Sequence, residues 1–278
     1  MKIAVLSGKG GTGKTTVSAS LACSSDGECR YMDCDIEEPN GAIFLKPLIS
    51  VVRNVTVPIP EIDISLCDFC GKCAVACQFN AIAVVKDKVI VFPEICHHCG
   101  ACMLACPNRA IFEKQRCIGI IEADNTFLFV QGKLNIGEPA GLAILKEMKK
   151  IAEDGTDTII DCPPGSSCTV VEAIGGCDYC VLVTQPDPFG LHDLKIAVSL
   201  VRKMGMDLGV VINKAEGKDG IIHKYCKKEN INILLEIPFS RNNAEKYSEG
   251  ILPVQFDPLL KKQFSEMYKK IFARRSKS

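Results

Sequence analysis

Two runs of cysteines in the middle of the chain have the spacing of metal-cluster ligands. Both follow C-x₂-C-x₂-C-x₃-C, within the similar segments LCDFCGKCAVACQFNAI, from Leu66, and ICHHCGACMLACPNRAI, from Ile95. The runs contribute Cys67, Cys70, Cys73 and Cys77, and then Cys96, Cys99, Cys102 and Cys106. Thiolates this close together on one loop can bind several irons of one cluster. Structural zinc is the alternative, although zinc sites rarely use this spacing twice.

The two runs resemble those of bacterial ferredoxins with two [4Fe–4S] clusters, except that Gln78 follows the first run where proline is usual. In such runs the fourth cysteine binds the other cluster. The resemblance implies that one cluster is bound by Cys67, Cys70, Cys73 and Cys106. It implies that the second is bound by Cys96, Cys99, Cys102 and Cys77.

A glycine-rich segment near the N-terminus has the spacing of a phosphate-binding loop. The segment GKGGTGKTT matches G-x-x-x-x-G-K-[ST] and lies between an apolar run and a helical stretch. Glycines there let backbone N–H groups curl around phosphate oxygens. We expect Lys14 to bind the β- and γ-phosphates of ATP and Thr15 to bind Mg²⁺. The loop residues expected at the nucleotide are Gly8, Lys9, Gly10, Gly11, Thr12, Gly13, Lys14, Thr15 and Thr16.

The same loop carries a second lysine, Lys9, directly after its first glycine. This K-G-G-x-G-K-[ST] form resembles the deviant P-loop of the MinD, Mrp and nitrogenase iron-protein group. In that group the early lysine reaches the nucleotide of the partner subunit. The resemblance therefore implies an ATPase that forms an ATP-dependent homodimer, or a heterodimer with a paralogue. A solvated loop lysine is the alternative role for Lys9.

Further segments resemble motifs of the same group. The sequence DCD, which ends at Asp35, resembles the first switch, and implies that Asp35 positions the attacking water. DCPPG, from Asp161, resembles the second switch, and implies that Asp161 supports Mg²⁺ through water, in keeping with the few carboxylates that Mg²⁺ takes. Asn213 and Pro238 resemble residues near the adenine, although an ordinary turn proline looks the same. The expected catalytic residues are Lys9, Lys14, Asp35 and Asp161.

The elements that must position these residues alternate between strands and helices. Short apolar runs predict strands at residues 2–6, 31–35, 158–161, 179–184, 208–213 and 232–237. Helix-like stretches lie at 15–23, 140–152, 190–204 and 220–230. This pattern predicts an α/β fold, a doubly wound and mostly parallel sheet, with a small α+β ferredoxin-like domain inserted. We expect the ATPase domain at 1–57 and 118–278 and the inserted domain at 58–117.

The composition narrows the class of protein. The 278 residues include 33 Lys+Arg and 33 Asp+Glu, so no strong net charge suggests a nucleic-acid partner. Without a signal-peptide pattern or an apolar run of about 20 residues, we expect a cytoplasmic protein that does not bind membranes. A C-terminal apolar stripe has basic neighbours that include Arg274 and Arg275. A membrane-binding tail is one interpretation, and a helix that covers the sheet is the other.

Three functions remain open. The first hypothesis is ATP-gated electron transfer to a redox partner through two [4Fe–4S] clusters. The second is an iron–sulfur or metallocofactor carrier of the Mrp type, which delivers a cluster to a metalloprotein. The third is a spatial organiser like MinD or ParA. Cys168, seven residues after Asp161, resembles a ligand of the cluster that bridges nitrogenase iron-protein dimers, but the second ligand of that cluster has no counterpart at 137–139.

Overall fold

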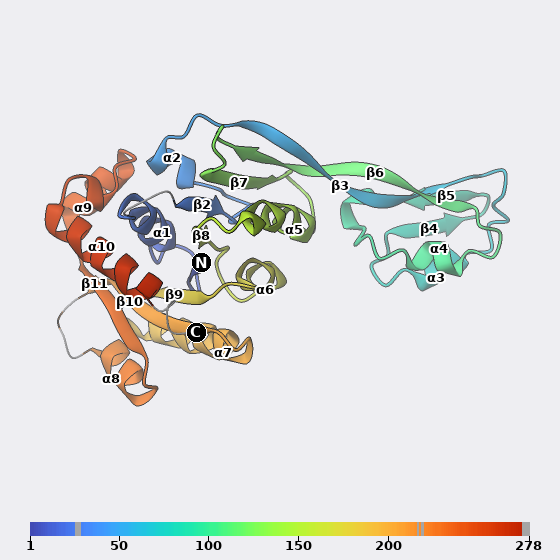
Figure 1. Ribbon diagram of the computed structural model, residues 1–278. Coiled ribbons are helices and arrows are strands. Elements are labelled where there is room, and N and C mark those ends of the chain that lie inside the picture. The colour runs from blue at the N-terminus through green and yellow to red at the C-terminus, as the bar shows by residue number, and fades with distance from the viewer. Residues whose placement is uncertain (26–28, 216, 218–219, 274–278) are drawn as a thin grey trace.

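The computed structural model describes residues 1–25, 29–215, 217 and 220–273. Its centre is a nine-stranded sheet in the order β11-β10-β9-β1-β8-β2-β7-β6-β3 (Figure 1). Strand β1 (Lys2–Leu6) lies between β8 (Thr158–Asp161) and β9 (Tyr179–Thr184) and is parallel to both. The pairings from β11 to β7 are parallel, and β6 and β3 are antiparallel to their neighbours. The predicted α/β fold with a mostly parallel sheet is therefore confirmed.

Three more strands lie where apolar runs predict them: β2 (Arg30–Asp33), β10 (Asp207–Ala215) and β11 (Asn232–Pro238). A further strand, β7 (Phe129–Leu134), is absent from the sequence-based prediction. It contains Gly132, where a Cβ would collide with side chains of the helix above it, among them Met148. Glycine there lets the helix approach the sheet closely, and it also obscures the apolar pattern that would predict a strand.

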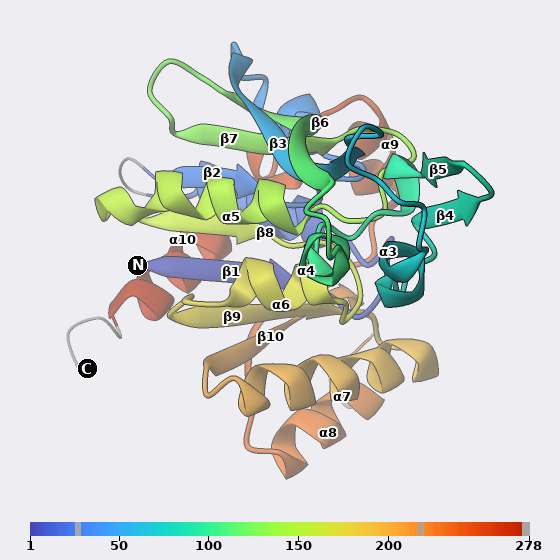
Figure 2. The ribbon, with the colours of Figure 1, turned by 90° about the vertical axis from the view of Figure 1, so that its right-hand side faces the viewer.

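Helices cover both faces of the sheet, as a doubly wound fold requires (Figure 2). One core lies under α5 (Leu142–Ile151), α6 (Cys168–Ile174), α7 (Pro188–Lys203) and α8 (Ile221–Lys228). The opposite core lies under α1 (Lys14–Cys23), α2 (Gly41–Leu45) and α10 (Pro258–Phe272). Another helix, α9 (Arg241–Ser248), precedes a short 3₁₀ turn at Pro253–Gln255. Two layers of helices thus bury the sheet between them.

Two long strands extend away from the sheet. β3 (Ser50–Ile62) and β6 (Ile111–Ala123) pair antiparallel up to Ile62 and Ile111, and Figure 1 shows them reaching a separate small unit. We call residues 63–110 the cysteine module. It contains α3 (Lys72–Ala76), β4 (Ile82–Val85), β5 (Lys88–Val91), a 3₁₀ turn (Pro93–Ile95) and α4 (Ala101–Ala105). The predicted boundaries at 57/58 and 117/118 fall inside these two strands.

The C-terminal apolar stripe packs against the sheet. Leu260, Phe264, Met267 and Ile271 of α10 are all buried in one core. This agrees with the interpretation of α10 as a covering helix. Arg274 and Arg275 lie outside the described residues. Within the described part of the chain, no helix has the length and apolar character needed to cross a bilayer.

Candidate functional site

The glycine-rich loop joins β1 to α1 at the carboxyl end of the parallel strands. Gly11 and Gly13 have φ values of 75° and 95°, which side chains with a Cβ rarely adopt. Gly13 is the N-cap of α1, so the first N–H groups of this helix face the space in front of the loop. Helix N-termini of this kind are ready-made anion sites. The loop therefore has the backbone geometry that phosphate binding needs.

A cavity opens in front of this loop. It is lined by loop residues from Lys9 to Thr15, by residues after β2 that include Asp35, and by residues after β8 that include Pro163 and Pro164. The structure therefore brings both predicted switch segments to the loop. Gly8, Thr16, Asp161, Asn213 and Pro238 do not line this cavity, and Asp161 is fully buried beneath it. Ser167 and Thr169 do, and they flank the exposed Cys168.

The ammonium group of Lys14 lies between two carboxylates. Its Nζ is 3.2 Å from Asp161 Oδ1 and 3.4 Å from Asp35 Oδ2, and the side chain is only 7% exposed. Burial opposes the charge on Lys14, but the two carboxylates outweigh it, so the pKa of Lys14 is raised. Burial also raises the pKa of Asp35, and Lys14 counteracts this effect only in part. Lys14 is thus a stable cation at the phosphate end of the cavity.

Two residues that the sequence analysis did not select hold Asp161 and the first switch in place. Tyr31 on β2 donates a hydrogen bond from its hydroxyl to Asp161 Oδ2 at 2.9 Å. Asp33 accepts backbone hydrogen bonds from Asp35, Asn40 and Gly41, at 3.1, 3.0 and 2.8 Å. Both side chains are buried. The only sequence signal for Asp33 is its place in DCD at the end of a strand. Side chains alternate between the two faces of a strand, so the direction of the Asp33 side chain depends on how β2 lies in the sheet.

The other predicted nucleotide residues occupy separate positions around the loop. Lys9 Nζ lies 5.7 Å from the ring centroid of Phe189, which is 75% exposed at the start of α7. Asn213 donates from Nδ2 to the carbonyl of Thr12 at 2.8 Å, so its amide braces the loop. Pro238 ends β11 and pairs in register with Ala215 of β10. Lys9 is therefore at the rim of the cavity, and Asn213 is behind the loop.

In the cysteine module, two cavities are lined by four cysteines each. One is lined by Cys67, Cys70, Cys73 and Cys106, and the other by Cys77, Cys96, Cys99 and Cys102. Each cavity thus takes three cysteines from one run and the fourth from the other. The two runs also share a backbone conformation, with positive φ at Phe69 and Gly71 and again at His98 and Gly100.

The fourth cysteine of each run has a polar neighbour. Ala81 N donates to Cys77 Sγ at 3.2 Å, and Ala110 N donates to Cys106 Sγ at 3.3 Å. Within the described ranges, no three His, Cys, Asp or Glu side chains converge closely enough to hold a single metal ion. The cysteines surround two spaces and do not meet at one point.

The loop, the sheet and the switch segments define a P-loop nucleotide-binding protein. Residues 3–254 match the CobQ/CobB/MinD/ParA nucleotide binding domain, and the chain belongs to this family. A relative, the uncharacterized protein MJ0579 of Methanocaldococcus jannaschii, is 31% identical over 259 residues, which are 90% of each chain. The iron-sulfur cluster carrier protein of the same organism is 22% identical over 294 residues, covering 97% of this chain and 83% of its own.

Solved structures show the same fold. The cell division ATPase MinD of Pyrococcus furiosus superposes with a TM-score of 0.59 at 21% identity, and the alignment covers 98% of each chain. MinD of Aquifex aeolicus in its complex with MinC gives a TM-score of 0.60 at 14% identity, over 98% of this chain and 96% of its own. At these identities the likeness concerns the fold alone.

Proposed function

We propose that this protein is an ATPase in which a nucleotide-driven dimer switch controls electron transfer through two [4Fe–4S] clusters. The observation that carries the proposal is the lining of the two cavities in the cysteine module. Each has four cysteines, drawn from both runs in the crossed pattern of two-cluster ferredoxins. The proposal assigns Cys67, Cys70, Cys73 and Cys106 to one cluster and Cys96, Cys99, Cys102 and Cys77 to the other.

The surroundings of the cysteines favour clusters over zinc. Structural zinc needs four ligands that meet around one ion, whereas a cubane needs thiolates spread around a larger body. The eight cysteines line two separate cavities in sets of four, and apolar residues such as Ile82 and Ile111 pack beside them. When bound, such clusters supply one-electron redox chemistry at potentials set by hydrogen bonds and exposure.

The nucleotide site supplies the switch. In the proposed cycle the phosphates of ATP replace Asp35 as a partner of Lys14, because they carry more charge than one carboxylate. The released Asp35 then orients the attacking water. Asp161 would support Mg²⁺ through water; its Oδ2 accepts a hydrogen bond from Tyr31, and its Oδ1 forms an ion pair with Lys14. The hydroxyl of Thr15, at the start of α1, would hold the metal.

Lys9 is the proposed contact across the dimer. It lies at the rim of the cavity, and its charge faces an exposed aromatic ring with no carboxylate partner in the described structure. A cation held at the mouth of a phosphate site can reach the phosphates of a second subunit. ATP then stabilises the dimer by joining the two subunits.

The test uses the full-length protein, purified without oxygen and reduced. Its oxidation by methyl viologen is followed in a stopped-flow instrument with ATP, ADP or no nucleotide. We expect ATP to change the rate several-fold and Lys14→Ala to remove the difference, while Lys9→Ala keeps ATP binding but abolishes the ATP-dependent dimer. Iron-free protein, or equal rates with and without ATP in a protein that binds ATP, contradicts the proposal.

A second candidate function is cluster delivery to another metalloprotein. It is favoured by the exposure of Cys70 and Cys99, one in each cavity, and by the whole-length similarity to an iron-sulfur cluster carrier protein. Exposed ligands allow an acceptor thiol to attack. Mixing the iron-loaded protein with an apo-ferredoxin separates the two functions. Iron that stays on the chain supports electron transfer, and iron that moves to the acceptor supports delivery.

A further inference from the structure

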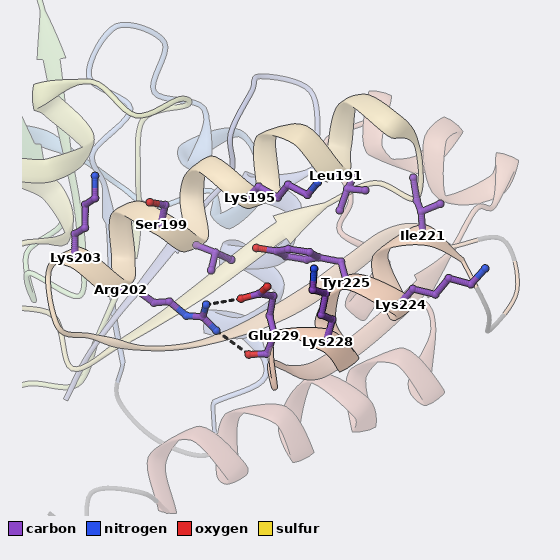
Figure 3. A pocket seen from close by; sticks show the side chains of 11 residues that line it. Leu191, Lys195, Ser199, Arg202, Lys203, Ile221, Lys224, Tyr225, Lys228 and Glu229 are labelled. Atoms are coloured by element: carbon purple, nitrogen blue, oxygen red, sulfur yellow. Dashed lines mark hydrogen bonds and ion pairs between the residues drawn. The ribbon is translucent and has the colours of Figure 1, made fainter.

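A groove between α7 and α8 shares no lining residue with the nucleotide cavity or with the cysteine module (Figure 3). It follows α7 from Leu191 to Lys203 on one side and α8 from Ile221 to Glu229 on the other. At 1.5 Å per residue, this part of α7 is about 18 Å long, or about three helical turns. The groove is thus an elongated surface feature of the ATPase domain.

The floor of the groove is apolar. Leu191 and Val198 contribute from α7, and Ile221 and Tyr225 contribute from α8. Val198 is 2% exposed and belongs to the core under these helices, so the floor is continuous with the interior. A ligand that lies along the groove can therefore bury apolar groups of its own.

The rim of the groove is basic. Five cations and one anion line it, although the whole chain carries equal numbers of basic and acidic residues. The lysines Lys195, Lys203, Lys224 and Lys228 have no carboxylate partner among the residues that the structure describes. Lys195 and Lys203 lie eight residues apart on α7, which separates them by about 12 Å. The positive charge is spread along the groove and does not converge on one point.

Side-chain contacts also fix the two helices of the groove relative to each other. Arg202 Nη1 donates to Glu229 Oε2 at 2.7 Å, and Nη2 donates to the Glu229 carbonyl at 2.7 Å, so the ends of α7 and α8 are tied together. Lys195 Nζ on α7 lies 5.9 Å from the ring centroid of Tyr225 on α8 (Figure 3). A preformed site loses less conformational entropy when a ligand binds.

We propose that this groove binds an amphipathic α-helix of a partner protein, with an apolar face and glutamates or aspartates on both sides of it. Helix-in-groove recognition uses apolar anchors at helical spacing, and the floor offers them a surface about three turns long. The lysines on the rim match carboxylates that flank such a face. A nucleic acid would use the lysines but leave the apolar floor unused, and a small anion would contact only one or two of the spread cations.

The test measures binding of a fluorescent probe peptide of about 14 residues, long enough for the groove. Its leucines are spaced i, i+3, i+4, i+7 and its flanks are glutamates. The reference peptide has the same composition in an order that has no apolar face. We expect the amphipathic peptide to bind about tenfold or more tightly than the reference peptide, since only it can cover the floor. Raising the salt concentration should weaken this binding, because exposed charge pairs are screened.

Paired variants test where the peptide binds. Lys195→Glu/Lys228→Glu reverses two charges on the rim, and Lys227→Glu/Lys262→Glu makes the same change at exposed lysines outside the groove. The first should weaken binding about tenfold or more, and the second should change it little beyond the general effect of net charge. Ile221→Ser should also weaken binding through the floor.

Three results would overturn the proposal. They are equal binding of the two peptides, equal loss in the two double variants, or displacement of the peptide by a 20-base single-stranded DNA through the same lysines. ATP binding by each variant shows that the domain is folded, because none of the substituted residues lies in the nucleotide cavity.

Discussion

Arg116 on β6 and Glu138 in the loop after β7 form an ion pair, with Nη2 and Oε1 2.7 Å apart. The same guanidinium donates from Nη1 to the carbonyl of Pro93, in the turn just before Cys96. Glu138 is only 4% exposed, so the pair is largely shielded from water. Arg116 therefore connects the cysteine module to the nucleotide-binding domain beside the cavity that Cys96 lines.

The loop that carries Glu138 also contacts the first switch. Leu134 N donates to the carbonyl of Ile36 at 2.8 Å, directly after Asp35. Gly141, at the other end of the loop, packs against the Ile36 side chain so closely that a Cβ would collide with it. The loop thus contacts the first switch at both of its ends and carries Glu138 of the ion pair. A movement of the first switch can therefore be passed through this loop to the ion pair and the cysteine module.

The ion pair predicts how the two halves are coupled. Glu138→Gln should remove the effect of ATP on cluster oxidation and increase hydrogen exchange at 93–96, while ATP hydrolysis continues. Removing one partner of a buried pair typically costs about 3–5 kcal/mol, so we expect a lower Tm as well. Glu61→Gln is the control: its pair with Lys114 joins β3 to β6 but is exposed, and such pairs contribute about 0–1 kcal/mol. An equal response of both variants would argue against a coupling role.

Double cysteine variants distinguish the crossed ligand sets from the uncrossed alternative. In the crossed arrangement, Cys67→Ser/Cys106→Ser affects one cluster, and Cys67→Ser/Cys77→Ser affects both. We expect the first variant to retain about half of the iron and the second to retain almost none. The opposite order would mean that each run binds its own cluster. Iron and sulfide analysis of anaerobically purified protein, with electron paramagnetic resonance of the reduced state, provides the measurement.

Tyr31 is expected to act on hydrolysis by positioning Asp161. Tyr31→Phe keeps the ring that stacks on Phe129 but leaves Asp161 Oδ2 without its donor. A buried acceptor that loses its partner costs about 1–3 kcal/mol, so kcat should fall roughly 5- to 100-fold. The Mg²⁺ concentration needed for half-maximal activity should rise, and a purely structural role would lower Tm without this change. Tyr225→Phe, outside the nucleotide site, is the matched control.

Asp33 is expected to make the stability of the protein depend on pH. Burial, together with the nearby charge of Asp161, raises the pKa of Asp33 to about 7, whereas an unfolded aspartate has a pKa of about 3.9. The folded protein thus holds this proton more tightly. The resulting stabilisation is present below about pH 4 and is lost as the pH rises through 7.

The variant Asp33→Asn isolates this contribution. Denaturant unfolding of both proteins without nucleotide should show the wild type losing stability relative to the variant between pH 4 and 7. The sign follows because only the wild type has to ionise a buried carboxylate in this range. A difference in unfolding free energy that stays constant with pH would mean that Asp33 does not titrate there.

The sequence predicts the part of the fold that carries the nucleotide. Strand, glycine-rich loop and helix follow one another within a short segment, and the structure pairs Lys14 with both Asp35 and Asp161. Parallel strands end at one edge of the sheet, so acidic residues after two such strands must meet there. Tyr31 and Asp33 could not be selected in the same way. Their role depends on which face of β2 they occupy and on the neighbouring strand.

The long strand β3 escaped prediction because Pro58 and Pro60 interrupt the apolar pattern, and β6 escaped because charged residues follow Phe112 in its first half. Proline cannot donate to a neighbouring strand, so it normally argues against a strand. Here β3 is the last strand of the sheet and pairs only with β6, so one side of its backbone needs no partner. The sequence contains the prolines, but the edge position that accommodates them is a property of the assembled sheet.

The pairing of Ile62 with Ile111 brings the two ends of the cysteine module next to each other. The chain therefore leaves the sheet and returns to it at almost the same point. A two-residue turn inserted between these strands should close them into an ordinary hairpin without rearranging the strands below. In a chain shortened in this way, nucleotide binding and hydrolysis could be measured without the eight cysteines of the module.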